Sequence, residues 1–112
     1  MRKIRIASDF SRFPAGRFYA DGPFSGEKFR EEVLKAAFAE GGDEGTVIEL
    51  DGTEGYGSSF LEEAFGGMVR KRYASADDLH KRLRIVTRDP SYERQIWSYI
   101  DRAASQQARA VA

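Results

Sequence analysis

The sequence predicts a single small α/β domain in which about four strands, mixed in direction, form a sheet packed by three main helices. Three observations support this fold class. The chain has 112 residues, which suits one domain, so we expect residues 1–112 to fold together. Short β-branched or alternating segments take turns with longer segments that carry apolar residues every three or four positions. Hydrophobic residues make up 41% of the chain and cysteine is absent, so we expect a core that needs no disulfides.

The N-terminal part is expected to hold one strand and a hairpin. Ile4 and Ile6 alternate with charged side chains over residues 3–7, a pattern typical of an edge or antiparallel strand with one solvated face. Residues 14–23 are rich in glycine and proline and leave room for a return strand around residues 17–19. Such a return strand would give the sheet its mixed direction.

Two long helices and a central strand are expected next. The first helix starts after Ser25, a preferred N-cap residue, and stops at the Gly41–Gly42 pair. Residues 46–51 are apolar and β-branched, as in a central strand, and lead through the glycine-rich turn 52–57 to a second helix. The apolar stripe of that helix consists of Phe60, Leu61, Ala64, Phe65, Met68 and Val69.

The C-terminal part is expected to add a short helix, a strand and a third long helix. Ser75–Asp78 matches a capping box and opens a helical turn that runs through His80. Residues 83–87 form the next strand, which we expect to run parallel to the central strand because a helical connection joins the two. Asp89–Pro90 supplies an N-cap and a proline at the first position of the last helix. Residues 105–112 are expected to fray.

No pattern of catalytic, cofactor-binding or metal-binding residues is apparent. Ser58 stands where a P-loop requires lysine, and Phe60 stands where a dinucleotide-binding loop requires glycine. His80 is the only histidine, and its polar neighbours favour a solvated surface position. Glu62 and Glu63 are adjacent, so they diverge on a helix, where they complement the helix dipole. We therefore expect a protein that is not an enzyme and that holds no cofactor or metal ion.

The charge pattern favours a protein partner over a nucleic acid. The chain carries 18 basic and 18 acidic residues, with an acidic middle and basic ends that can steer a charged partner. The basic clusters at 70–72 and 81–84 are short, so nucleic-acid binding is not expected. The N-terminus interleaves charged and apolar residues and fits neither a signal peptide nor a membrane segment. We therefore expect a cytoplasmic location without membrane contact.

Two serines at the start of the second helix have two interpretations. Ser58 and Ser59 follow the glycine-rich turn, where free backbone N–H groups and the helix dipole would stabilise a phosphate. Serine is also a preferred N-cap residue, so we expect one of the two to cap the helix. The pair therefore indicates either a phosphorylation site or a cap.

The run Gly57–Gly67, together with residues 22–29 and 47–52, resembles the bacterial STAS-like domain family of unknown function. That family is similar to the STAS domain of sulfate transporters and anti-sigma factor antagonists, a small α/β regulatory module. The resemblance implies that Ser58 matches the serine phosphorylated in such antagonists, with Ser59 as the next hydroxyl. It also implies a partner, a serine kinase of the histidine-kinase-like ATPase fold. Gly57 replaces the aspartate of the antagonist motif, and Phe60 replaces its glycine.

The leading hypothesis is a non-enzymatic signalling module that binds a protein partner through the loop 52–59, with binding gated by phosphorylation of Ser58. The residues expected to contact the partner are Tyr56, Gly57, Phe60 and Glu63. Phe60 also suits the core, because it lies in the apolar stripe. The alternative hypothesis is a sensor of a small ligand or nucleotide that uses the glycine-rich turn and the helix N-terminus.

Overall fold

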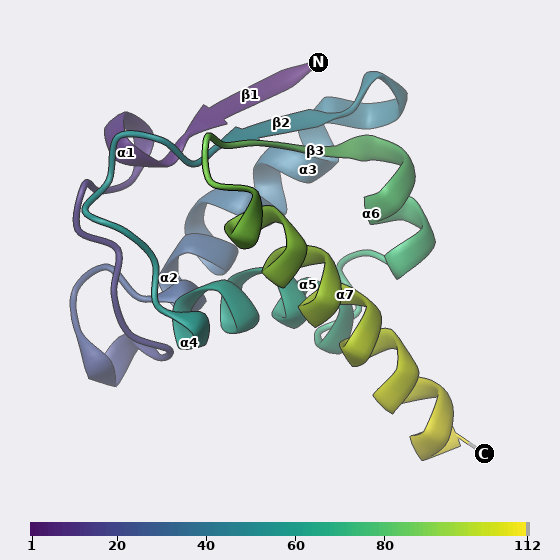
Figure 1. Ribbon diagram of the computed structural model, residues 1–112. Coiled ribbons are helices and arrows are strands. Elements are labelled where there is room, and N and C mark those ends of the chain that lie inside the picture. Colours follow the sequence, from purple (N-terminus) through teal and green to yellow (C-terminus); the bar gives the residue numbers. More distant parts are fainter. Residues whose placement is uncertain (112) are drawn as a thin grey trace.

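The computed structural model describes residues 1–111 and contains a three-stranded sheet covered by helices (Figure 1). Along the chain the elements are β1 (Arg2–Arg5), α1 (Ile6–Asp9), η1 (Tyr19–Asp21), α2 (Gly26–Phe29), η2 (Arg30–Leu34), α3 (Lys35–Gly41), η3 (Gly42–Glu44), β2 (Thr46–Glu49), α4 (Ser58–Leu61), η4 (Glu62–Gly66), α5 (Gly67–Arg70), α6 (Ala76–Arg82), β3 (Leu83–Val86) and α7 (Pro90–Val111). No helix within this part of the chain is both long and apolar enough to cross a bilayer.

Two of the three expected long helices contain a π-helical turn. α2, η2 and α3 follow one another without a break over residues 26–41, and α4, η4 and α5 do so over residues 58–70. The turns η2 and η4 are π-helical, a feature that is rare and often found at functional sites. We refer to these two units as the 26–41 helix and the 58–70 helix.

The helix starts confirm most of the expected caps. The Ser25 hydroxyl accepts a hydrogen bond from the Lys28 N–H, and the Ser75 hydroxyl accepts one from the Asp78 N–H. The Asp89 carboxylate accepts a hydrogen bond from the Ser91 N–H at 2.9 Å, ahead of α7. These local bonds satisfy N–H groups that the first turn of a helix leaves free.

The sheet has three parallel strands in the order β1-β2-β3, which differs from the expected four mixed strands. The central place of β2 is confirmed, and Ile48 on β2 aligns with Ile4 on β1 and Ile85 on β3. Residues 14–23 contain no return strand. Their backbone instead bonds to the start of the 26–41 helix, for example from the Glu27 N–H to the Arg17 carbonyl at 2.9 Å.

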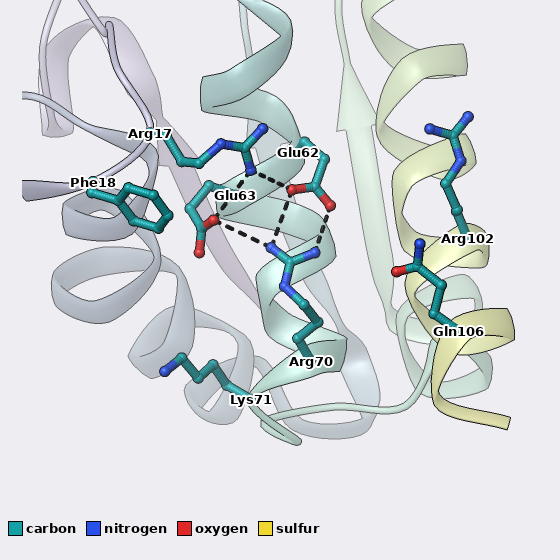
Figure 2. Close-up of a pocket in the computed structure, with 8 residues that line it drawn as sticks. All are labelled: Arg17, Phe18, Glu62, Glu63, Arg70, Lys71, Arg102 and Gln106. Carbon is teal, nitrogen blue, oxygen red and sulfur yellow. Dashed lines mark hydrogen bonds and ion pairs between the residues drawn. The ribbon is translucent and has the colours of Figure 1, made fainter. Parts of the chain in front are cut away.

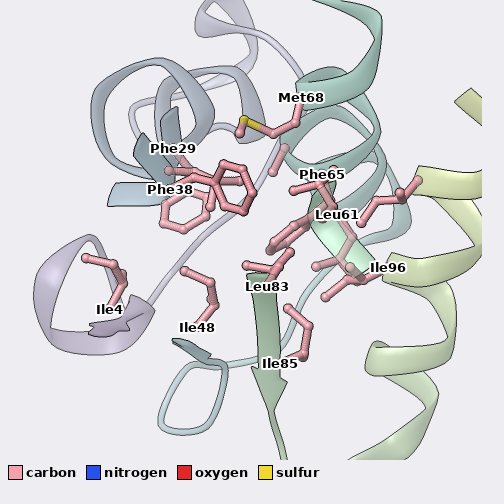
Figure 3. Packing of buried hydrophobic residues seen from close by; sticks show 14 of the residues in the cluster. Ile4, Phe29, Phe38, Ile48, Leu61, Phe65, Met68, Leu83, Ile85 and Ile96 are labelled. Atoms are coloured by element: carbon pink, nitrogen blue, oxygen red, sulfur yellow. The ribbon is translucent and has the colours of Figure 1, made fainter. Parts of the chain in front are cut away.

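The helices lie on one face of the sheet (Figure 1), and this explains the alternation in the first strand. Ile4, Ile48 and Ile85 point into the core beneath the sheet, together with helical residues such as Phe29 and Phe65 (Figure 3). The opposite face carries partly or fully exposed side chains: Lys3, Arg5, Val47, Glu49, Arg84 and Val86. The alternation thus reflects a parallel edge strand with one solvated face, although parallel sheets usually have both faces covered.

The last helix extends further than expected. α7 continues to Val111, and Ala112 lies outside the described residues. Fraying of residues 105–112 in solution stays a prediction. Ala103 is buried, and the Gln107 side chain donates a hydrogen bond to the Val69 carbonyl at 2.7 Å. This bond ties the C-terminal half of α7 to the 58–70 helix.

The close approach of the two π-containing helices depends on Gly67, and we predict that Gly67→Ala destabilises the fold. A Cβ at this position would collide with the buried Arg30 guanidinium. We expect the free energy of unfolding, measured by urea titration, to fall by about 1–3 kcal/mol.

The matched control is Gly57→Ala. Gly57 has φ of −76° and no neighbour within 4 Å of an added Cβ, so we expect a loss below about 1 kcal/mol. Equal losses in the two variants would contradict the proposed close contact.

Candidate functional site

The loop 52–59 lies at the carboxyl end of β2 and is held in place by two tyrosines. The Tyr56 hydroxyl donates a hydrogen bond to the Leu50 carbonyl at 2.6 Å, and the Tyr56 N–H donates to the Tyr92 hydroxyl at 3.3 Å. Gly52 and Gly55 adopt φ of 99° and 120°, values that favour glycine. Tyr56 therefore fixes the loop against the sheet and α7.

Neither serine caps the 58–70 helix. Gly57 occupies the N-cap position, and no side chain bonds the first turn. Ser58 and Ser59 are both exposed, and within residues 1–111 no hydrogen bond involves either hydroxyl. The expectation that one of them is the cap is wrong, because Tyr56 and the extended Gly57 set the path by which the chain enters the helix. The two hydroxyls are left free at the protein surface.

The four residues expected to contact a partner do not share one surface. Gly57 is exposed, and Tyr56 is half-buried with its hydroxyl directed to the sheet. Burial raises the pKa of Tyr56 to about 12. Phe60 is fully buried and Glu63 is 6% exposed. Of this set, only Gly57 and part of Tyr56 are accessible, and Phe60 belongs to the core.

The hollow at this loop does not favour an anion. It has a volume of about 250 Å³ and is lined by Leu50, Asp51, Gly52, Thr53, Glu54, Gly55, Tyr56, Thr87 and Tyr92. Two carboxylates and no basic side chain face it, so a phosphate there would meet like charge. The structure therefore gives no support to the sensor hypothesis at the glycine-rich turn.

The single histidine of the sequence lies at the protein surface. His80 lies exposed on α6, with its Nε2 2.7 Å from Asp101 Oδ1 and its ring stacked on Trp97. It bonds neither serine. The expectation of a surface histidine is confirmed.

A buried ion pair joins the two π-helical turns. Arg30 is 1% exposed, and its Nη1 donates to the Glu63 carboxylate at 2.5 Å and to the Glu63 carbonyl at 2.8 Å. Its Nε donates to Glu31 at 2.8 Å. Burial alone would raise the pKa of Glu31, but hydrogen bonds from Arg30 and Tyr73 outweigh it and lower that pKa. The buried cation is thus compensated on two sides.

The ion-pair network continues to the surface through Glu62, which lies between two arginines (Figure 2). Its carboxylate accepts from Arg17 at 2.6 Å and from Arg70 at 2.5 Å. Burial acts to raise the pKa of Glu62, but the bonds from Arg70 and Arg17 hold it below its ordinary value. Glu62 and Glu63 lie beyond the first helical turn, so these arginines, and not the helix dipole, are their main partners.

A polar hollow opens beside this network. Its volume is about 700 Å³, and it is lined by Arg17, Phe18, Glu62, Glu63, Arg70, Lys71, Arg102 and Gln106. Figure 2 shows Arg102 and Gln106 on α7 at one side, and Phe18 at the other. We call this feature the polar hollow.

The buried pair and the polar hollow were not predicted from the sequence. A signal for the pair was present, because Arg30 lies four residues before Leu34, which lies four before Phe38. This spacing places Arg30 on an apolar helix face. Glu63 likewise lies within the stripe that contains Phe60 and Ala64. One charged residue on the apolar face of each of two helices indicates a buried ion pair. No pattern in the sequence indicates that Arg17 and Arg70 lie close together.

The buried pair predicts a large difference between two arginines that contact the same acid. Arg30→Met removes the buried donor of Glu63 Oε2 and of the Glu63 carbonyl and leaves only the contacts of Arg17 and Arg70 with Glu63 Oε1. We therefore expect a loss of about 3 kcal/mol in the free energy of unfolding. Arg17→Met removes a partner whose side chain is 33% exposed, so we expect a loss of about 1 kcal/mol or less. Chemical denaturation of both variants gives the comparison, and similar losses would contradict the assigned burial.

The free hydroxyls predict that Ser58→Ala and Ser59→Ala each change the free energy of unfolding by less than about 0.5 kcal/mol. Ser25→Ala is the matched control, because its hydroxyl does cap a helix, and it should cost about 1 kcal/mol. A cost at Ser58 or Ser59 as large as that at Ser25 would show that the serine caps the helix in solution.

Comparison with protein-family models supports the resemblance seen in the sequence. A model described as a STAS-like domain of unknown function matches residues 25–93. The match begins at the N-cap of α2, includes the loop 52–59, and ends in the first turn of α7, so that β1 lies outside it. Comparisons with curated proteins and with solved structures gave no significant match. Because the family model covers more than half of the sequence, the chain belongs to the STAS-like domain family of unknown function.

Proposed function

We propose that the chain is a non-enzymatic regulatory module that binds a protein partner through the loop 52–59, and that phosphorylation of Ser58 controls this binding. The observation that carries the proposal is the state of the two serines. Both hydroxyls are exposed and unbonded at the start of the 58–70 helix. A kinase can therefore reach them without breaking a cap or opening the core.

Helix geometry favours a phosphate at this position. The backbone N–H groups of a first helical turn and the positive end of the helix dipole stabilise a negative charge. A phosphate would add a charge of about −1.5 to −2 at neutral pH near Asp51 and Glu54. The phosphate would add bulk and negative charge at Ser58, so a partner that packs closely against the unmodified hydroxyl would lose that contact.

The rigid loop supports recognition by a folded partner. Tyr56 is bonded to Leu50, directly after β2, and to Tyr92 on α7, so the loop has a defined shape before binding and costs little ordering free energy. Membership in a STAS-like family supports a partner of the kind that STAS regulators use, a serine kinase of the histidine-kinase-like ATPase fold, in the cytoplasm. The surface offered to it consists of Glu54, Gly57, Ser58 and Ser59 rather than the buried Phe60 and Glu63.

The test is the intact mass of the purified protein after incubation with Mg-ATP and a lysate of its native host. We expect one added phosphate in the wild type and in Ser59→Ala, and none in Ser58→Ala. Ser91→Ala is the matched control, because Ser91 also lies in a first helical turn but its N–H is engaged with the Asp89 carboxylate. That variant should still gain the phosphate.

Two outcomes would overturn the phosphorylation step. A phosphate that persists in Ser58→Ala would show that another residue is modified. The absence of added mass in the wild type would show that the protein is not phosphorylated under these conditions and would overturn the proposed step. Binding through the loop is tested separately by capture of host proteins on immobilised wild type and Gly57→Arg. Unchanged capture by Gly57→Arg would exclude the loop from the interface.

A further inference from the structure

We infer that the polar hollow is a binding site for a small phosphate monoester that carries an aromatic group. This inference concerns a site different from the loop 52–59 and does not depend on the phosphorylation of Ser58. It rests on the charge, the free hydrogen-bond donors and the exposed aromatic ring that meet at one hollow.

The charge at the hollow is not balanced within the described residues. Arg17, Arg30 and Arg70 are paired with the three carboxylates of Glu31, Glu62 and Glu63. Lys71 and Arg102 also line the hollow, and no ion pair involves either of them within residues 1–111. Two positive charges are therefore in excess. A phosphate monoester carries about −1.5 to −2 at neutral pH and would match them.

Hydrogen-bond donors are held in place around the hollow. Arg17 uses only its Nη1 for Glu62 and Glu63, so its other guanidinium nitrogens are free to donate. The pairing with Glu62 restrains both Arg17 and Arg70, which reduces the entropy lost when a ligand binds. Guanidinium groups suit phosphate oxygens, to which they donate two parallel hydrogen bonds.

An aromatic ring completes the lining. Phe18 is 47% exposed, and it lies across the hollow from Arg102 (Figure 2). Exposed rings beside polar groups are typical of ligand sites, because they bind flat apolar groups. The volume of about 700 Å³ suits a ligand of nucleotide size. The aromatic group would contact Phe18, and the phosphate would lie towards Lys71 on the same side of the ion-pair network (Figure 2). Arg102 lies on the opposite side, on α7, and would add to the positive charge of the hollow.

The test is calorimetric titration of the purified protein with adenosine monophosphate, phosphotyrosine and inorganic phosphate. We expect saturable binding of at least one aromatic monoester that weakens as salt rises. Binding of adenosine monophosphate alone would identify a nucleotide site, and binding of phosphotyrosine alone would identify a modified side chain as the source. No binding of either aromatic ester at millimolar concentration would overturn the inference.

Variants separate the two halves of the ligand. Lys71→Ala should weaken binding by roughly fivefold or more and Arg102→Ala by a smaller factor, whereas Phe18→Ala should weaken the aromatic esters and leave inorganic phosphate unchanged. Arg94→Ala is the control, because Arg94 is exposed on the same helix as Arg102 but does not line the hollow. All four side chains are exposed, so thermal unfolding should confirm intact folds. Equal affinity of wild type, Lys71→Ala and Arg102→Ala would overturn the assignment of the site.

Discussion

The buried pair of Arg30 and Glu63 is the constraint on which the arrangement of the two π-containing helices depends. Burying a charged side chain away from water destabilises the folded state by several kcal/mol unless the charge is paired and fully hydrogen-bonded. Arg30 meets this condition only where Glu63 offers both its carboxylate and its carbonyl, with Glu31 on the other side. Sliding one helix along the other by a turn would leave the cation unpaired. The pair therefore sets the register of the helices, whatever it contributes to stability.

Small residues make this register possible, and they place the 58–70 helix between two neighbours. Gly67 faces the Arg30 side chain, and Gly66 faces the backbone of α7 at Tyr99. Gly26 lets the 26–41 helix approach the 58–70 helix closely, because a Cβ at Gly26 would lie 2.5 Å from the Phe60 carbonyl oxygen. The middle of the 58–70 helix thus packs between the 26–41 helix and α7, whereas its two ends reach the surface. The serines lie at one end, and Arg70 borders the polar hollow at the other.

The sequence predicts the local features of this protein well and the long-range ones poorly. Helix starts at Ser25 and Ser75 and the central place of residues 46–49 follow from preferences that act within a few residues. The first strand was expected to be an edge or an antiparallel strand, and it is a parallel edge strand. Alternation left its direction open because it reports only which face is solvated, and one-sided coverage of a parallel sheet gives the same pattern as an antiparallel strand. The cap at Ser58 or Ser59 was wrong because a preference of about 1 kcal/mol cannot oppose a loop path fixed by Tyr56. The polar hollow brings together residues from three separate segments, and no spacing in the sequence reports such a meeting.

Phe60, which replaces the glycine of the antagonist motif, fixes the rotation of the start of the 58–70 helix. Its ring packs against Phe29 and Tyr56, with centroids 6.0 and 5.8 Å apart, and this inward position fixes the rotation of the helix start. Each residue of an α-helix turns the side chain by about 100°, so Ser59 points to the side of Phe60 and Ser58 points nearly opposite to it. A glycine at position 60 would leave that rotation to the loop alone. The aromatic ring therefore directs Ser58 away from the core, as the proposed phosphorylation of Ser58 requires.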